Sequence, residues 1–318
     1  MGFLDYWRSS RARLDTELAR QIPDFFRGLP PSHLKPVRRV LADGKRLRGC
    51  LVCLISDALG GSAQAAVARA IAIECIQAAS LIHDDVVDGD ALRRDRAATW
   101  VAVGRRRAVL LGDLIFATAL QRMVELSQED GRATAEVIAT MAAGAYQEPL
   151  AHRGCGPAPL AAEADLYPRL IHLKTGALFA AAARLGSLAA GAAPAVARQA
   201  FEFGARVGEA YQIADDLRDL IELDSASEAD LRAQLPLLAP LLAHFCADTI
   251  SRDDMLCGTG DIGPRLAALR PLLRQRMGAA MQARLSQAAA LVHGFPDNGY
   301  TALLQAAPAQ ITRLMLDG

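Results

Sequence analysis

The amino-acid sequence predicts a single all-α bundle. Apolar residues recur at helical spacing along most of the chain. Hydrophobic residues make up 52% of the chain and aromatic residues only 5%, and the dominance of Ala and Leu favours close-packed helices over sheets. No alternating apolar and polar run is long enough for a sheet, and no linker divides the chain, so we expect one domain over residues 1–318.

Glycine, proline and polar residues mark the ends of the predicted helices. Gly28, Asp43-Gly44 and Gly60-Gly61 separate the first segments. Residues 89–99 and 154–159 are polar or rich in glycine and proline, and predict loops. A bend is expected near Pro168, and Pro194 suits the first position of a helix. The predicted helices cover residues 3–27, 34–41, 45–59, 63–87, 106–126, 132–147, 161 onward through the bend, 194–223, 230–249, 263–292 and the segment after Pro296.

Charge and hydropathy exclude several classes of function. The formal net charge is zero, so no overall field favours nucleic acid or an anionic membrane. The N-terminal residues lack the basic and apolar regions of a signal peptide. Charged or proline residues interrupt the most apolar segments, so we expect no membrane span. Cys50 and Cys53 form a CxxC motif, but the chain has no second cysteine pair with the spacing of metal ligands. We therefore expect these two cysteines to lie on a buried helical face. We expect a soluble, cytoplasmic protein.

One apolar helical segment ends in three aspartates, Asp84, Asp85 and Asp88. On a helix Asp84 and Asp88 share one face, and Asp85 flanks it. The three like charges repel, and the C-terminal end of a helix carries partial negative charge, so this position favours a cation. Hard oxygen donors at this spacing suit Mg²⁺, which binds one or two carboxylates and completes its octahedron with water and substrate phosphate.

A second stretch repeats this spacing. Asp215, Asp216 and Asp219 follow another apolar helical run, whereas the pair Asp253-Asp254 has Cys257 at the position of the last acid. A solvated helix end would explain either trio alone. The recurrence at two apolar helices favours a shared metal-binding function, because two facing trios need bridging cations.

Basic residues near the helix breaks are candidates for binding the anionic part of a substrate. Lys45 and Arg48 begin a predicted helix, whose free N–H groups also favour an anion. Arg93 and Arg94 follow the first acidic trio, and Lys174 lies at the predicted bend. Each residue alone is compatible with a solvated surface charge. Their placement beside the breaks and the acidic trios favours a site for metal-bound phosphates.

The helix before Asp84 offers an apolar surface. Ser80, Ile76 and Ile73 lie on the same face as Asp84, with Ala79 beside them. A molecule with a diphosphate head and a hydrocarbon tail would match this surface, with cations at the mouth and aliphatic side chains below.

Six motifs in this order resemble those of the trans-isoprenyl diphosphate synthases of the polyprenyl synthase family, over nearly the whole chain. They are Gly44-Lys45-Arg46-Leu47-Arg48, Leu81-Ile82-His83-Asp84-Asp85-Val86-Val87-Asp88, Arg93-Arg94, Gly112-Asp113, Lys174-Thr175-Gly176 and Gln212-Ile213-Ala214-Asp215-Asp216-Leu217-Arg218-Asp219. The resemblance implies a single-domain helical bundle around a deep central cavity, of the isoprenoid synthase type. It also implies a homodimer and three Mg²⁺ ions.

The resemblance assigns roles to individual residues. It implies that metal is bound by Asp84, Asp85 and Asp88 on one wall and by Asp215 and Asp219 on the other. Positions that bind isopentenyl diphosphate in the family are matched by Lys45, Arg48, Gln77 and Arg94. Positions on the side of the allylic diphosphate are matched by Arg93, Lys174 and Gln212, and Thr175 would place an oxygen near the developing cation.

The implied reaction is a five-carbon extension. Metals and cations stabilise the departing pyrophosphate, the double bond of isopentenyl diphosphate attacks the allylic carbocation, and loss of a proton completes the step. Resembling enzymes that stop early place bulky aromatics four or five residues before the first Asp. Here these positions are Ser80 and Ala79, above Ile76, so we expect a geranylgeranyl product of twenty carbons or longer unless Phe116 or Met123 closes the tunnel.

Three other functions share parts of this pattern. A farnesyl diphosphate synthase would have the same motifs and a shorter product. A class I terpene cyclase resembles the fold, but its second motif is usually of an Asn/Ser/Glu type. A non-catalytic partner subunit of a heteromeric synthase tends to lose the acidic motifs, which this chain keeps. The chain departs from the family in lacking lysines after the second acidic motif, where Arg232 is the candidate substitute.

Overall fold

The two acidic motifs lie on two long helices, α4 (Ala63–Asp88) and α10 (Pro194–Glu222). The computed structural model describes residues 2–27, 30–42, 44–93, 96–147, 166–223, 227–249 and 262–316. The Ser62 hydroxyl caps the start of α4 by accepting a hydrogen bond from the Ala65 N–H at 3.2 Å. Gly89 ends α4 in the left-handed conformation with φ of 75°, which a glycine adopts without steric cost.

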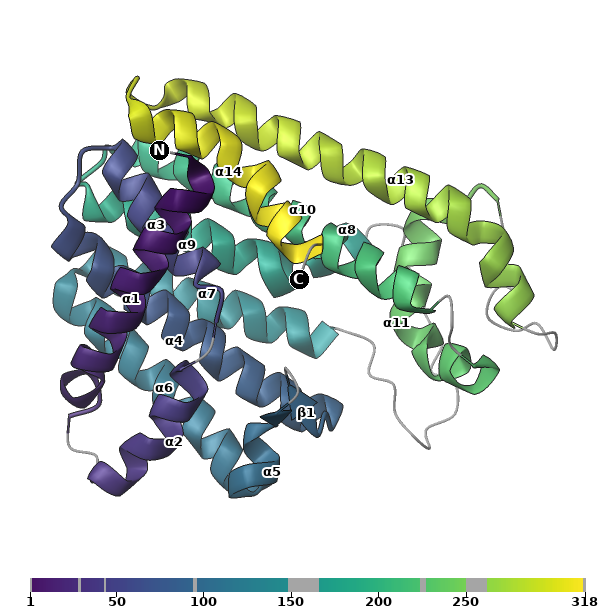
Figure 1. Ribbon diagram of the computed structural model, residues 1–318, viewed down its shortest axis with the longest axis horizontal. Helices are drawn as coiled ribbons and strands as arrows, with labels where there is room; N and C mark the ends of the chain where they lie inside the picture. Colours follow the sequence, from purple (N-terminus) through teal and green to yellow (C-terminus); the bar gives the residue numbers. More distant parts are fainter. Residues whose placement is uncertain are drawn as a thin grey trace.

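The described segments confirm the all-α prediction (Figure 1). Besides α4 and α10, the elements are α1 (Phe3–Phe25), α2 (Pro31–Leu41), α3 (Leu47–Ala58), α5 (Thr99–Val103), α6 (Arg105–Leu126), α7 (Gln128–Gln147), α8 (Leu166–Ile171), the π-helix η1 (His172–Gly176), α9 (Ala177–Ala189), α11 (Glu228–Cys246), α13 (Ile262–Leu291), the 3-10 helix η3 (Val292–Gly294) and α14 (Gly299–Leu316). The predicted loop over residues 89–99 also contains a short antiparallel pair, β1 (Leu92–Arg93) with β2 (Arg96–Ala97), in which Leu92 pairs with Ala97.

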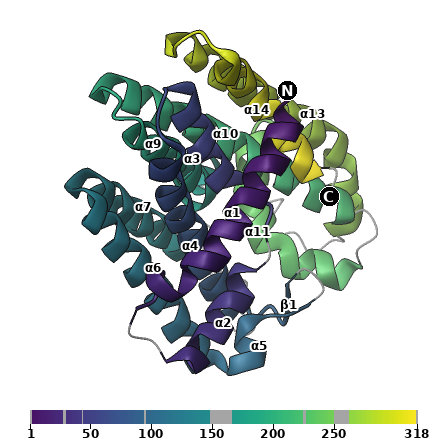
Figure 2. The same cartoon turned by 60° about the vertical axis from the view of Figure 1, so that its left-hand side comes forward.

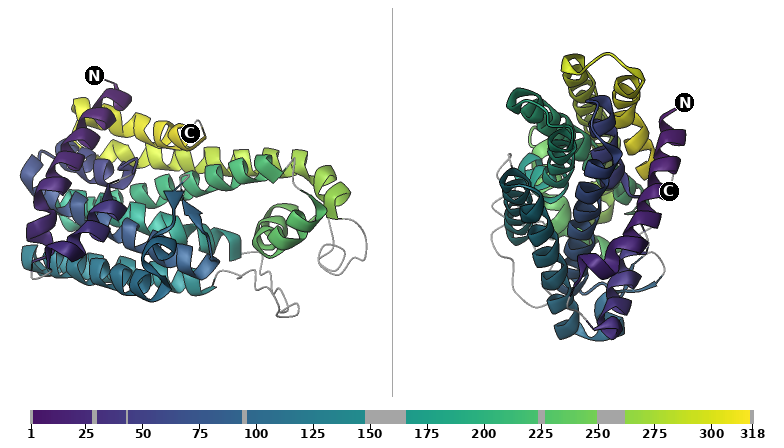
Figure 3. Two further views of the ribbon diagram at one scale, coloured as in Figure 1. Left: turned by 60° about the horizontal axis from the view of Figure 1, so that its bottom comes forward. Right: turned by 90° about the vertical axis from the view of Figure 1, so that its left-hand side faces the viewer.

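The helix α9 lies between the two acidic helices, and α3 packs beside it. Both pack against α4, and α9 also packs against α10. α1 crosses α3 and α4 obliquely (Figure 2). α13 runs along α10 and extends toward α11 at one end of the molecule (Figure 3). Both acidic helices are therefore held by the same central layer.

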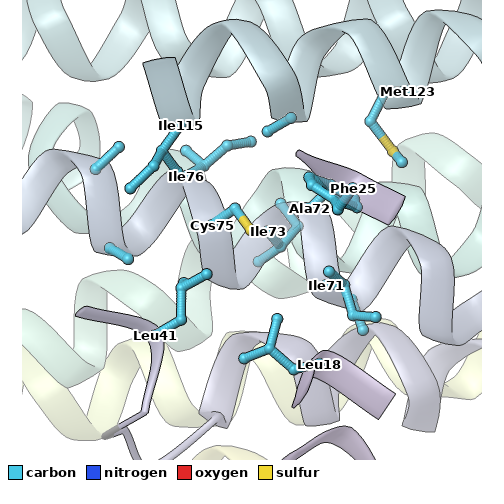
Figure 4. Packing of buried hydrophobic residues seen from close by; sticks show 14 of the residues in the cluster. Leu18, Phe25, Leu41, Ile71, Ala72, Ile73, Cys75, Ile76, Ile115 and Met123 are labelled. Atoms are coloured by element: carbon cyan, nitrogen blue, oxygen red, sulfur yellow. The ribbon is translucent and has the colours of Figure 1, made fainter. Parts of the chain in front are cut away.

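The largest hydrophobic core surrounds α4. Ile73 and Ile76 of α4 are fully buried, and Ile76 lies beside Ile115 of α6 (Figure 4). Phe25 of α1 lies near Met123 at the other end of this core. By length and composition α4 could span a membrane, but 67% of its most apolar stretch is buried inside the protein. Its hydropathy is therefore that of a core helix.

A close crossing joins α9 to α10 and requires glycine. A Cβ atom on Gly204 of α10 would lie 2.3 Å from the carbonyl oxygen of Phe179 and 2.8 Å from the Cα of Ala180. Four residues later, a Cβ on Gly208 would lie 2.8 Å from the Cα of Gly176. The two glycines let η1 and α9 lie against the face of α10 that leads to the second acidic motif.

Candidate active site

Two of the three aspartates in the second motif share one arginine. The Arg218 Nη2 atom donates to Oδ1 of Asp215 at 2.7 Å and to Oδ1 of Asp219 at 3.4 Å. Burial raises the pKa of Asp215, although the positive charges of Arg218 and Lys174 oppose this. Burial also raises the pKa of Asp219, and the charge of Asp215 adds to the effect. Asp215 and Asp219 therefore form a pair of negative charges, and the positive charges of Arg218 and Lys174 partly balance them.

Asp216, the middle aspartate of this motif, makes different contacts. Asp216 accepts a hydrogen bond from the Tyr167 hydroxyl at 2.7 Å on one oxygen and from Gln212 Nε2 at 2.9 Å on the other. Burial raises its pKa to about 6. Because Tyr167 belongs to α8, Asp216 fixes that helix against α10 and has both oxygens engaged.

The motif Lys174-Thr175-Gly176 lies in the π-helix η1. The Thr175 hydroxyl is buried and donates to Oε1 of Gln212 at 2.6 Å. Lys174 is exposed, and its positive charge acts against the rise in the pKa of Asp215 on the neighbouring helix α10. The structure thus brings together four residues expected at the allylic side or the second metal site: Lys174, Thr175, Gln212 and Asp215.

The first acidic motif also divides its aspartates. Asp84 is half-buried and Asp88 is exposed at the end of α4, whereas Asp85 is buried. Asp85 accepts a hydrogen bond from Arg93 Nε at 2.5 Å. Burial raises the pKa of Asp85 despite this contact. The contact between Asp85 and Arg93 therefore holds β1 to α4. In this arrangement the Asp85 carboxylate is engaged by Arg93, which makes it less available as a metal ligand.

A buried arginine fixes the start of α3. Arg46 has a left-handed backbone with φ of 53° and donates from Nε to Asp15 at 2.8 Å. Its Nη1 lies 3.5 Å from the buried carboxylate of Glu74 on α4, and the same carboxylate accepts the Gly49 N–H at 2.8 Å. These contacts fix the backbone at the first turn of α3, and so they fix where the neighbouring Lys45 and Arg48 begin.

The two expected basic residues at this helix start point to different parts of the molecule. Lys45 Nζ donates to the carbonyl oxygen of Leu314 in α14 at 2.6 Å. The Arg48 guanidinium lies over the Phe179 ring, 4.4 Å from its centroid, and its buried Nε has no hydrogen-bond partner among the described residues. Burial lowers the pKa of Arg48, and the nearby charge of Asp215 acts against this. The Phe179 ring under Arg48 also contacts the Tyr211 ring of α10, 5.5 Å between centroids, so Arg48 and Tyr211 lie against the same aromatic ring.

The remaining predicted residues lie on α4, on α6 or outside the described residues. Gln77 is half-buried, and its carbonyl oxygen accepts the Ser80 hydroxyl at 2.9 Å. Ile76 and Ala79, expected to affect chain length, are fully buried in the core. Met123 is buried there too, and the Phe116 ring contacts the His83 ring at a tilt, with the ring centroids 5.5 Å apart. Arg94 lies outside the described residues.

Within the described ranges, no cluster of three or more Asp, Glu, His or Cys side chains could hold a metal ion. The acidic motifs instead offer carboxylate pairs on two separate helices. Mg²⁺ commonly uses only one or two protein carboxylates together with water and phosphate, so a bound diphosphate would have to complete such a site.

Sequence reasoning missed three residues that shape the site: Tyr167, Glu209 and Arg218. Arg218 could have been noticed, because it lies within a helical turn of two acids on the same helix. Tyr167 and Glu209 have no local signal, since their importance comes from partners on other elements.

Carboxylates and basic side chains on the helices of an all-α bundle are suited to bind a diphosphate through divalent cations. Comparison with known proteins agrees with this class. The polyprenyl synthetase family model matches residues 31–230. The chain therefore belongs to the polyprenyl synthetase family.

Individual relatives have products of different length. A short chain isoprenyl diphosphate synthase of Methanothermobacter thermautotrophicus is 31% identical over 224 residues, which are 70% of this chain and 67% of that protein. Component 2 of the heptaprenyl diphosphate synthase of Geobacillus stearothermophilus is 29% identical over 304 residues, 92% of each chain. A solved polyprenyl synthase from Caulobacter crescentus, in complex with calcium and isoprenyl diphosphate, has a TM-score of 0.75 at 25% identity and covers 97% of each chain. The family and these relatives indicate a prenyltransferase.

Proposed function

We propose that the chain is a trans-isoprenyl diphosphate synthase, which condenses isopentenyl diphosphate with an allylic diphosphate and acts as a cytoplasmic homodimer. The observation that carries the proposal is the contact of η1 with α10, where the Thr175 hydroxyl donates to Gln212 and Gln212 donates to Asp215. Lys174 precedes Thr175 in η1, and Arg48 of α3 lies over Phe179, whose ring also contacts Tyr211 of α10. Cations and a carboxylate from three elements in one region suit a diphosphate that is itself bound to metal. Membership in the polyprenyl synthetase family supports the same reaction class.

The carboxylates fit a divalent metal. Asp84 and Asp88 on α4, and Asp215 and Asp219 on α10, are hard oxygen donors of the kind Mg²⁺ prefers. Arg218 forms ion pairs with both carboxylates of the second pair, and a metal ion would compete with it for them. When bound, Mg²⁺ would stabilise the negative charge of the departing pyrophosphate. We assign Asp85 to Arg93 and expect its contribution to metal binding to be smaller than that of Asp84 or Asp88.

The protein side chains bind and orient the two substrates. Lys45, Arg48, Gln77 and Arg94 are proposed to hold isopentenyl diphosphate, and Arg93, Lys174 and Gln212 the allylic diphosphate. Arg48 is suited to this task because its buried Nε finds no partner in the described part of the chain, and a buried unsatisfied donor gains from a charged acceptor. The Thr175 hydroxyl, oriented by Gln212, keeps oxygen lone pairs available toward a developing positive charge.

A product of twenty carbons or longer is proposed from the side chains before Asp84. Ser80 and Ala79 leave no aromatic ring in the two positions where resembling short-chain enzymes have one. The tail would follow α4 toward Ile76 and Met123, which are packed in the core and would have to move aside for a longer product. Mass spectrometry of the products would test this length, and a sole fifteen-carbon product would refute it.

The proposed function is tested with purified protein, Mg²⁺, isotope-labelled isopentenyl diphosphate and a panel of allylic primers. We expect label in prenyl diphosphates with the wild type and none with Asp84→Ala. Hydrocarbon formed without isopentenyl diphosphate would indicate a terpene cyclase instead. An inactive protein that gains activity only with a second polypeptide would identify a partner subunit.

A further inference from the structure

A buried carboxylate next to the site collects donors from three elements. Glu209 lies on α10, one turn before Gln212, and is 5% exposed. His172 Nδ1 of η1 lies 3.0 Å from Oε1. Arg206 Nη1 donates to Oε2 at 2.8 Å, and Arg284 Nε of α13 donates to the same oxygen at 3.1 Å. Since an ionised carboxylate only accepts hydrogen bonds, His172 must carry its proton on Nδ1.

The charge state of Glu209 agrees with this arrangement. Burial would raise its pKa, but the hydrogen bonds from His172 and Arg206 and the charge of Arg284 outweigh burial, and the pKa is lowered. The carboxylate is therefore ionised and holds all its donors at neutral pH.

The element attached to Oε1 is the π-helix η1, which contains Lys174 and Thr175. π-Turns within α-helices are rare and need support from their surroundings. This one is attached to α10 at two points, by His172 to Glu209 and by Thr175 to Gln212. Close packing adds to both contacts, because a Cβ on Gly176 would lie 3.3 Å from Glu209 Cγ.

We propose that Glu209 and His172 are positioning residues that hold η1 in its π conformation, so that Lys174 and Thr175 face the second acidic motif. This inference rests on the proposed function, in which Lys174 binds the allylic diphosphate. His172 lies within one turn of Lys174, and neither His172 nor Glu209 has to touch substrate. Without the contact to Oε1, η1 can relax to ordinary α-helical geometry, which rotates Lys174 away from Asp215.

The two oxygens of Glu209 separate a positioning role from a structural one. Among the described residues, Oε1 contacts His172 of η1, whereas Oε2 accepts from Arg206 of the same helix and from Arg284 of α13. His172→Ala removes the first contact and leaves the second. Arg284→Ala is the matched control, because it removes a donor of Oε2 and leaves His172 in place. His172→Asn provides a rescue, since an Asn amide can donate from a position close to that of Nδ1.

Steady-state kinetics with each substrate varied, together with thermal unfolding, test the inference. We expect His172→Ala to lower kcat/KM for the allylic diphosphate by about 10- to 100-fold, the effect of a small misplacement of a binding group. The KM for isopentenyl diphosphate and the Tm should stay at the wild-type values, and His172→Asn should recover most of the loss. Arg284→Ala should lower Tm and leave the allylic kcat/KM unchanged.

Three outcomes would overturn the inference. An inactive wild type would refute the proposed function and the inference with it. An active wild type with unaffected His172→Ala kinetics would refute the inference alone. Equal losses for both substrates, accompanied by a fall in Tm and no rescue by His172→Asn, would show that His172 only stabilises the fold.

Discussion

The close crossing of α9 and α10 can be tested by one added methyl group. In Gly204→Ala the new Cβ would lie 2.3 Å from the Phe179 carbonyl oxygen and 2.8 Å from the Ala180 Cα. These are backbone atoms of a buried helix and cannot rotate away. Overpacking of this kind costs about 1–3 kcal/mol, and backbone contacts place this case near the upper end. Alanine gains about 1 kcal/mol over glycine in a helix interior, so the net loss is about 2 kcal/mol.

Gly278→Ala is the matched control. Gly278 lies within α13, and a Cβ there would meet no atom within 4 Å. The same substitution should therefore stabilise the protein by up to about 1 kcal/mol through helix propensity alone. In thermal unfolding we expect Tm to fall by about 4 °C for Gly204→Ala and to rise by about 2 °C for Gly278→Ala. Equal shifts for both variants would refute the packing argument.

Three further predictions concern charge and burial. Arg218→Gln removes the cation that would compete with Mg²⁺ for Asp215 and Asp219. Because an exposed ion pair contributes up to about 1 kcal/mol, the Mg²⁺ concentration for half-maximal activity should fall by up to about fivefold; an increase would show that Arg218 assists metal binding. Asp130→Ala should cost about 3–5 kcal/mol in urea unfolding because it leaves the largely buried Arg69 unpaired, and a loss below about 1 kcal/mol would mean that the pair behaves like one at the surface. Burial raises the pKa of Cys53 to about 11, so almost none of its thiol is the reactive thiolate at neutral pH. Peptide mapping after iodoacetamide treatment at neutral pH should find Cys53 unmodified in the native protein and modified in urea.

Local periodicity was sufficient to predict the helices that carry the motifs. The helix predicted over residues 63–87 is observed as Ala63–Asp88, and the one over 194–223 as Pro194–Glu222. Apolar spacing and terminal Gly or Pro residues act within a few turns, so a single sequence contains this information.

The division of labour within each aspartate trio could not be predicted. Spacing makes Asp85 and Asp216 resemble their neighbours, yet each is engaged by a side chain from another element, Arg93 and Tyr167 respectively. The π-turn at Lys174 was also beyond prediction, because its supports, Glu209 and Gly208, lie more than thirty residues away in sequence. Such differences depend on tertiary contacts, which motif spacing does not contain.

Binding of inorganic pyrophosphate, followed by titration calorimetry with and without Mg²⁺, tests the central claim most directly. If carboxylates from α4 and α10 bind one metal-bridged diphosphate, the wild type should bind pyrophosphate only when Mg²⁺ is present, and Asp84→Asn and Asp215→Asn should each weaken that binding strongly. Pyrophosphate binding that is independent of Mg²⁺, or that is unchanged in both variants, would contradict the account.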